Sequence, residues 1–324
     1  MPSVPVGGKG RNEMLIDNEN VLKLLQCPKS GGKLKAINNK LIGEDHEEVI
    51  EYDIVKGYPV LIDFENSVLR KEDTLSLSSV IERHSYTGVS GIAKRLINLP
   101  KKATEENINH VIRLLPKGNG NPRILIVGGG TVGQGTEFFY ENPQVDLVSF
   151  DIYASPFVQF LADAHHIPLP DKSFDAVIVQ AVLEHVLVPE KVVSEIYRIL
   201  KENGIVYAET PFLQHVHEGA YDFTRYTESG HRYLFRKFEL IRSGVSAGAG
   251  TQLLWTLDNF FRGLFRSKRL GKVVKLFFFW LQYCDKLIPD SYNMDSASEI
   301  FFLGKKQAVE INDKEIIAHY KGAQ

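Results

Sequence analysis

A glycine-rich run follows an apolar segment near the middle of the chain. Residues 124–127 are predicted to form a strand, and the sequence continues Gly-Gly-Gly-Thr-Val-Gly-Gln-Gly. Gly128, Gly130 and Gly133 fit the spacing G-x-G-x-x-G, in which missing side chains let the backbone approach a ligand closely. Open α/β sheets bind cofactors at the carboxyl ends of their strands. The spacing alone would also suit a nicotinamide cofactor.

Two acidic residues further along are candidates for contacts with a nucleoside. Asp151 lies about 20 residues beyond Gly130, at the end of the next predicted strand, where a carboxylate can accept hydrogen bonds from both ribose hydroxyls. Asp163 suits an exocyclic amino group, because a carboxylate is an acceptor only. For both residues the alternative is a structural role in a turn or helix cap.

A longer pattern distinguishes between cofactors. From residue 161 the chain reads Leu-Ala-Asp-Ala-His-His-Ile-Pro-Leu-Pro-Asp-Lys-Ser-Phe-Asp, followed by a predicted strand and Gln-Ala-Val-Leu-Glu-His. Residues 124–212 as a whole resemble the class I S-adenosylmethionine-dependent methyltransferases of the type 11 kind. The resemblance implies that S-adenosylmethionine is the cofactor and that the glycine turn receives its methionine half. It also implies that Asp163 bonds the adenine amino group and that Ala164 lines the adenine pocket.

Gln180 and His185 follow the predicted strand 176–179, at the edge of the sheet where the cofactor is expected. We assign both to cofactor binding. For His185, tying down the adjacent loop is an alternative of equal weight. Asp175 precedes a buried strand, which favours a structural role.

The polar segment 210–227 follows a fourth predicted strand, and such carboxyl-end loops carry substrate contacts in this architecture. Its candidate catalytic side chains are His215, His217, Tyr221 and Arg225. A histidine could act as a base near neutral pH, the arginine could clamp an anion, and the tyrosine could bind a sugar face. Methyl transfer is an in-line displacement that alignment alone can accelerate, so a base is optional. The alternative is a surface loop in which Asp222 pairs with Arg225.

We expect no metal in this segment. The candidate ligands are His215, His217, Glu218 and Asp222. In an extended loop the two histidines would point in opposite directions, which argues against a shared ion.

The elements that position these residues indicate an α/β fold. Apolar strands at 124–127, 147–150, 176–179 and 205–208 alternate with helices, which predicts a Rossmann-like, mostly parallel sheet. A helix is expected from Pro189 to a stop at Gly204. Residues 298–304 are predicted to form the last strand, antiparallel as in the family.

A small β-rich unit is expected at residues 19–66, after a flexible tail at 1–18. Its stretches LLQCPKSGGKL and KGYPVLID resemble the Trm112-like family, whose members often bind zinc. Strand-like patterns are expected around Leu22, Leu24 and Leu25. Cys27 has no partner, since Ser30 stands where a second cysteine would be expected, so we predict a buried thiol and no metal.

Two further segments complete the predicted organisation. A helical connector is expected at 67–120, with Ile92, Leu96 and Ile108 among its apolar positions. The methyltransferase domain then spans 121–324, with a helical insertion at about 249–290 that is rich in aromatic and basic residues. We favour a helical lid whose aromatic side chains are core. The alternative is peripheral contact of the 255–281 region with an anionic membrane.

Composition limits the classes of partner. The formal net charge is -2, so no general attraction to nucleic acid is expected. Cys27 and Cys284 cannot form a secreted type of disulfide framework, and no segment has the length of a membrane span, which favours the cytoplasm. The predicted function is methyl transfer to a small molecule or glycan. Alternatives are an RNA or protein methyltransferase, an NAD(P)-dependent oxidoreductase, and a catalytically silent partner subunit.

Overall fold

The structure is a computed structural model that describes residues 18–45, 48–76, 101–118 and 120–324. The chain divides into two compact units. The first contains Met1–Val80, Val111–Val179 and Glu190–Val206, and the second contains Ile81–His110, Gln180–Pro189 and Tyr207–Gln324. The expected tail at 1–17 and the connector positions Ile92 and Leu96 lie outside the described residues.

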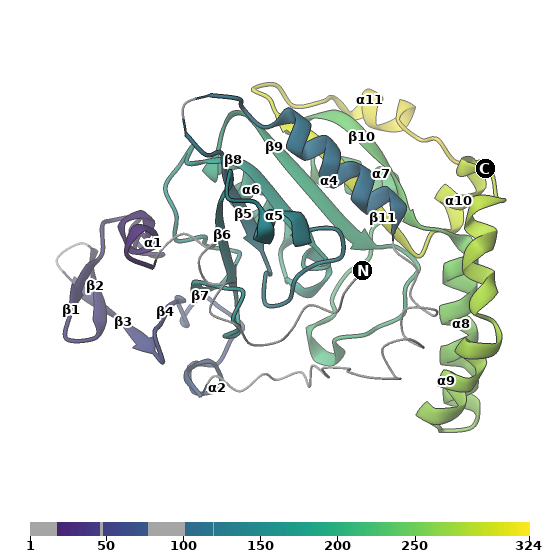
Figure 1. The fold of residues 1–324 in the computed structure, drawn as a ribbon, viewed down its shortest axis with the longest axis horizontal. Coiled ribbons are helices and arrows are strands. Elements are labelled where there is room, and N and C mark those ends of the chain that lie inside the picture. Colours follow the sequence, from purple (N-terminus) through teal and green to yellow (C-terminus); the bar gives the residue numbers. More distant parts are fainter. Residues whose placement is uncertain (1–17, 46–47, 77–100, 119) are drawn as a thin grey trace. The chain divides into compact units, whose positions relative to one another are not determined.

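The first unit is built on a parallel sheet. Its central strands are β5 (Arg123–Val127), β6 (Asp146–Asp151), β7 (Phe160–Ala162) and β8 (Phe174–Gln180). They lie in the order β7-β6-β5-β8, and each neighbouring pair is parallel (Figure 1). The strands are almost wholly buried, as expected for a parallel sheet covered on both faces. The predicted strands are confirmed, and the short β7 is an addition to them.

Helix α6 (Pro189–Ile199) precedes β9 (Leu200–Pro211). The predicted helix is confirmed, with Val192 and Ile196 fully buried on its apolar stripe. Its predicted end at Gly204 is wrong, because the chain turns to extended structure at Leu200. Asn203, within β9, has a φ of 63°.

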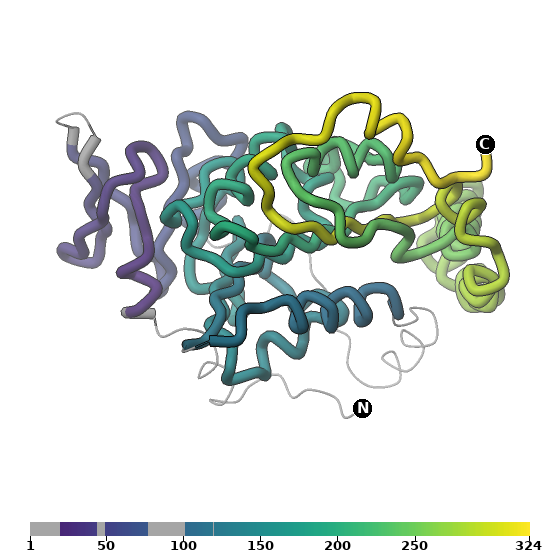
Figure 2. Tube along the Cα trace, turned by 90° about the horizontal axis from the view of Figure 1, so that it is seen from above, coloured from purple at the N-terminus to yellow at the C-terminus, as the bar shows by residue number. Residues whose placement is uncertain are grey.

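The N-terminal part of the first unit is a small antiparallel meander. Helix α1 (Asn18–Leu24) is followed by β1 (Lys35–Ile37), β2 (Lys40–Asp45), β3 (Glu48–Val55) and β4 (Tyr58–Leu61). These strands are the purple part of the tube in Figure 2. β4 also pairs in parallel with β7, with Val60 opposite Leu161, so the meander extends the sheet of its own unit.

The strand-like interpretation of Leu22 and Leu24 is wrong, because both residues lie in α1. The buried residues here are Val21 and Leu25, four positions apart, which is the spacing of one helix face.

The second unit contains an antiparallel pair, β10 (Phe238–Ala247) and β11 (Glu299–Lys306). This confirms an antiparallel last strand. The unit also contains the start of α4 (Lys102–Leu114) and the short helices α7 (Glu228–Leu234), α10 (Asp290–Ser296) and α11 (Asp313–Ala318). Ile108 is buried on α4, as the helical spacing predicted.

The predicted insertion is a helical hairpin of α8 (Ala249–Leu264) and α9 (Lys268–Phe277), continued by η3 (Phe279–Lys286). The two helices lie side by side (Figure 1; Figure 2). Their close approach needs a glycine, since a Cβ on Gly271 would lie 2.2 Å from Asp258 Oδ1. Among the described residues, no helix combines the length and apolar character needed to span a bilayer.

The expectation that the aromatic side chains of this hairpin are core is wrong for four of them. Phe260, Phe265, Phe277 and Trp280 are 58%, 55%, 73% and 50% exposed. On α8 the buried face is formed by Gly250, Leu254 and Asp258, which leaves Phe260 on the opposite face in solvent.

Candidate active site

The glycine turn after β5 is shaped by contacts that exclude side chains. Gly128 has a φ of 73°, a conformation that glycine adopts at no steric cost. The Gly129 N–H donates to the Phe150 carbonyl at 2.9 Å, and a Cβ on Gly129 would lie 1.9 Å from Ser149 Oγ. The turn is therefore packed directly against β6.

Asp151 holds this turn through a hydrogen bond. Its side chain, at the end of β6, is 6% exposed, and Oδ2 accepts from the Gly130 N–H at 2.7 Å. Oδ1 accepts from the Ile152 N–H at 2.6 Å. These two bonds fix the carboxylate at the carboxyl end of β6, where the contact with a ribose diol was predicted. The structure therefore brings the predicted glycine and the predicted carboxylate into contact.

Asp163 directly follows β7, the strand next to β6. One carboxylate oxygen accepts from the His165 N–H at 2.9 Å and lies 2.6 Å from His165 Nδ1, and the other accepts from the Ser67 hydroxyl. Burial would raise the pKa of Asp163, but these hydrogen bonds outweigh it and hold the pKa below its usual value. The carboxylate is thus charged and oriented. It also holds the following turn, which is the structural role considered as the alternative.

The loop that contains Ala164 is tied to α6. Arg198 donates to the carbonyls of Ile167 and Leu169 at 2.8 Å each, and Glu195 accepts from the Ile167 N–H at 2.9 Å. Ala164 is buried, at 6% exposed. These contacts fix the irregular segment that contains Ala164 against α6.

The predicted site residues divide between the units. Those in the first unit are Gly128, Gly130, Gly133, Asp151, Asp163 and Ala164, and those in the second are Gln180, His185, His215, His217, Tyr221 and Arg225. Asp175, which we assigned to structure, accepts from the Arg123 N–H and from Lys201 Nζ, both at 2.8 Å.

Gln180 belongs to a buried polar cluster of the second unit. Its Nε2 donates to Glu209 Oε2 at 3.0 Å. Glu209 is 1% exposed. Lys101 Nζ lies 3.7 Å from the Glu209 carboxylate and is in direct contact with the Glu299 carboxylate. Burial would lower the pKa of Lys101, but the two carboxylates outweigh it and raise the pKa. The lysine therefore stays charged and compensates two buried acids.

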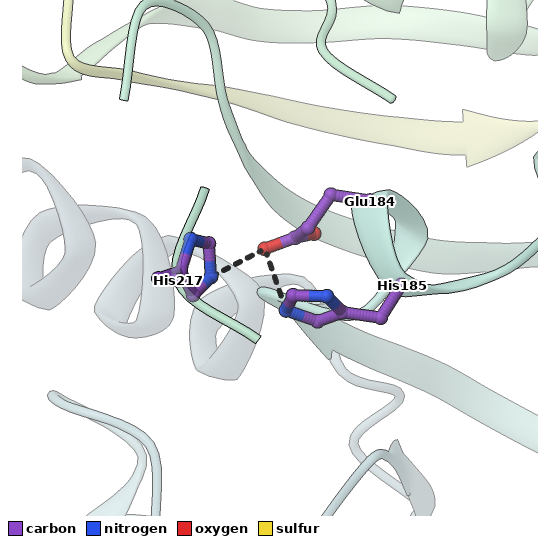
Figure 3. A group of neighbouring side chains, drawn as sticks. All are labelled: Glu184, His185 and His217. Atoms are coloured by element: carbon purple, nitrogen blue, oxygen red, sulfur yellow. Dashed lines mark ion pairs between the residues drawn. The ribbon is translucent and has the colours of Figure 1, made fainter. Parts of the chain in front are cut away.

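A second cluster joins two loops of the second unit (Figure 3). Glu184 and His185 lie in the short helix η1 (Leu183–His185), and His217 lies in the segment after β9. Glu184 Oε1 is 3.5 Å from His185 Nε2 and 3.8 Å from His217 Nε2. The Glu184 side chain is 1% exposed, and burial raises its pKa to about 8.

The other nitrogen of each histidine faces an acceptor. His185 Nδ1 lies 2.7 Å from the Tyr221 carbonyl. His217 Nδ1 lies 3.2 Å from the His215 carbonyl and 3.4 Å from Asp222 Oδ2. Carbonyl and carboxylate oxygens only accept, so each Nδ1 carries a hydrogen. Burial lowers the pKa of His185, which keeps its ring neutral.

Arg225 has no N–H left for an anion. Its five donors meet the carbonyls of Gln214, His215 and Thr224 and both carboxylate oxygens of Asp222. Burial would raise the pKa of Asp222, but these bonds outweigh it and lower the pKa to about 2. Arg225 therefore has no donor available for the expected role as an anion clamp. The pairing of Asp222 with Arg225, which the surface-loop alternative predicted, is present.

Comparisons with known proteins identify the class. The model of a family described as "Methyltransferase domain" matches residues 132–208. With the glycine turn and Asp151 in contact, this match shows that the protein is an S-adenosylmethionine-dependent methyltransferase. No curated protein sequence matches the chain.

Solved structures of similar fold are distant. Phosphoethanolamine N-methyltransferase 2 of Haemonchus contortus, in complex with S-adenosyl-L-methionine, is 16% identical over 85% of this chain and 71% of that chain, with a TM-score of 0.43. The YcgJ protein of Bacillus subtilis is 14% identical over 63% of this chain and 98% of that chain, with a TM-score of 0.38. Likenesses at these scores say nothing about the acceptor.

Sequence reasoning missed Glu184. A signal was present, since an acidic residue stands beside a histidine directly after a strand and an apolar turn. Nothing in the sequence indicated that its carboxylate would be buried and would face His217.

Proposed function

We propose that the protein transfers the methyl group of S-adenosylmethionine to a hydroxyl of an uncharged polar acceptor, a small molecule or a glycan that is free or lipid-linked. The observation that carries this acceptor class is Arg225, the arginine of the predicted substrate loop, whose donors are all used within the protein. The net charge of -2 gives no attraction to RNA either.

The cofactor residues of the proposal are those predicted from the sequence. Asp151 receives the ribose, Asp163 and Ala164 receive the adenine, and the turn of Gly128, Gly130 and Gly133 receives the methionine half. The bond from Gly130 N–H to Asp151 supports the proposal, because it holds the carboxylate at the carboxyl end of β6. His217 is the candidate that activates the acceptor hydroxyl, together with Glu184 and His185. His215 and Tyr221 remain candidates for substrate contact, and Arg225 is reassigned to positioning the loop.

Calorimetric titration with S-adenosylmethionine tests the cofactor half of this proposal. Asp151→Ala and Asp163→Ala should each weaken binding at least tenfold, since each removes a charged acceptor. Asp171→Ala is the matched control, because Asp171 belongs to the same loop but pairs with Arg198 at the surface. Unchanged affinity in both test variants would contradict the assignment.

Labelled methyl transfer into fractions of a cell lysate tests the acceptor half. We expect incorporation into the small-molecule, oligosaccharide or glycolipid fractions. Incorporation into RNA or protein would overturn the acceptor class while leaving the cofactor site intact. No incorporation in any fraction would favour the catalytically silent alternative.

We also propose that residues 19–66 form a Trm112-like domain that supports the cofactor site. Its small antiparallel meander and its docking support this. Ser67 donates to Asp163, the Gln26 N–H donates to the Pro168 carbonyl at 2.9 Å, and β4 extends the sheet at β7.

We further propose that the exposed face of the α8–α9 hairpin contacts an anionic membrane surface from the cytoplasmic side. Apolar side chains such as Phe265 and Phe277 are exposed in this hairpin, and so are the basic residues Lys268 and Lys272. Sedimentation with anionic vesicles should be lost in Phe265→Asp/Phe277→Asp and retained in Val309→Asp, an equally exposed apolar position outside the hairpin. Equal sedimentation of both variants would contradict this contact.

A further inference from the structure

A buried carboxyl group and two imidazole nitrogens converge in the second unit. Glu184 Oε1 faces the Nε2 atoms of His185 and His217 at 3.5 and 3.8 Å (Figure 3). The Nδ1 atom of each imidazole faces another acceptor, which leaves each Nε2 directed at Glu184. Carboxylate oxygens and imidazole nitrogens are both ligands of divalent metal ions.

Neither oxygen of Glu184 has a hydrogen-bond partner among the described residues, although the side chain is 1% exposed. A buried carboxylate without hydrogen bonds is unfavourable when charged, so it takes up a proton, pairs its charge or binds a metal. Arg225, the nearby cation of the same loop, is fully engaged by Asp222 and three carbonyls.

The geometry points to a site for one divalent transition-metal ion, with zinc as the preferred ion, bound by Glu184 Oε, His185 Nε2 and His217 Nε2. The three ligand atoms all lie within 4.8 Å of one another. A tetrahedral zinc ion with ligands at about 2.0 to 2.1 Å holds those atoms about 3.4 Å apart, so small side-chain shifts suffice. Two histidines and one glutamate with an open fourth position form a known type of catalytic zinc site.

The surroundings of the two histidines also fit metal ligation. A ligating histidine usually donates its second N–H to a carbonyl or a carboxylate, which fixes the tautomer and the ring orientation. His185 has the Tyr221 carbonyl in this position, and His217 has the His215 carbonyl and Asp222. Arg225 in turn holds Asp222, so the outer contacts of the site are themselves ordered.

This inference differs from the expectation of no metal, which considered His215 and His217 as a pair. The geometry replaces His215 with two residues of another loop. The inference concerns metal binding alone, and it holds whether or not methyl transfer uses the ion. When bound, a zinc ion could hold an acceptor hydroxyl at its open position and lower the pKa of that hydroxyl.

The test uses the full chain without a polyhistidine tag, stripped with a chelator and titrated with Zn²⁺ in a calorimeter. Co²⁺ serves as a spectroscopic substitute whose visible absorption reports nitrogen coordination, and Mg²⁺ serves as a hard ion that this ligand set should not bind. The variants are Glu184→Gln and His217→Gln, which preserve approximate side-chain size. His319→Gln is the matched control, because His319 lies 2.7 Å from Glu228 in another buried histidine–carboxylate pair of the same unit.

We expect one Zn²⁺ per chain in the wild type and in His319→Gln, and affinity weakened roughly 100-fold or more in each ligand variant. Thermal melts without metal establish that each variant is folded. The inference is overturned if the folded wild type binds no Zn²⁺, if both ligand variants bind as the wild type does, or if His319→Gln loses binding to the same extent. Loss of zinc binding with intact S-adenosylmethionine binding would separate this site from the cofactor site.

Discussion

A buried histidine makes the stability of the second unit depend on pH. His231 on α7 is 1% exposed, and neither ring nitrogen has a hydrogen-bond partner among the described residues. Its ring lies against Phe235 and Phe302, at centroid distances of 5.1 and 6.3 Å. Burial lowers its pKa from 6.5 to about 3, since the charged form would be desolvated.

The sign follows from proton linkage. The unfolded chain binds a proton at this histidine below pH 6.5, and the folded chain does so only near pH 3. The stability associated with the neutral ring is therefore complete above pH 6.5 and is lost as the pH falls from 6.5 towards 3. At pH 5 the loss is about 2 kcal/mol, from 1.36 kcal/mol for each unit of pH below the unfolded pKa.

The perturbation is His231→Leu, which has a similar volume and cannot ionise. Between pH 8 and pH 5 its free energy of unfolding should change by about 2 kcal/mol less than that of the wild type. Urea unfolding followed by tryptophan fluorescence measures this, since Trp255 and Trp280 both lie in the second unit. Tyr233→Phe, an exposed position on the same helix, should keep the wild-type pH dependence. The reasoning is refuted if His231→Leu and the wild type lose stability in parallel over this range.

Two further changes have defined outcomes. Gly129→Ala places a Cβ 1.9 Å from Ser149 Oγ, so the affinity for S-adenosylmethionine should fall at least tenfold. The double variant Gly129→Ala/Ser149→Ala should recover part of this affinity. Calorimetric titration measures both, and an unchanged affinity in Gly129→Ala would contradict the packing argument. Lys101→Met leaves Glu209 and Glu299 buried without a cation, which should cost about 3 kcal/mol at pH 8. This loss of unfolding free energy should shrink as the pH falls, because the carboxylates take up protons. Urea unfolding at several pH values measures it, and a loss that does not change with pH would contradict the prediction.

Sequence patterns within single segments correctly predicted several strands and one helix. The strands β5, β6 and β8 are continuous apolar runs between turn residues, and the helix α6 has an apolar stripe of period 3.6, so burial and element type coincide. The bond between Gly130 and Asp151 followed from the rule that parallel strands end at one edge of a sheet. The aromatic residues of the α8–α9 hairpin could not be placed in this way. Periodicity shows that a helix has an apolar face, and whether another element covers that face depends on tertiary packing.

The Glu184 cluster shows where reasoning from spacing reaches its limit. The alternation of side chains along an extended loop argued against a shared ion for His215 and His217, and the cluster indeed omits His215. That rule compares neighbours within one segment. Glu184 and His185 are adjacent, and in an extended strand they too would point apart, but they lie in a 3-10 turn, where the rule does not apply. His217 reaches them because Arg225 and Asp222 bend the loop after β9, and this bend depends on five hydrogen bonds to one guanidinium. The chemistry of the cluster therefore rests on a tertiary contact between two loops.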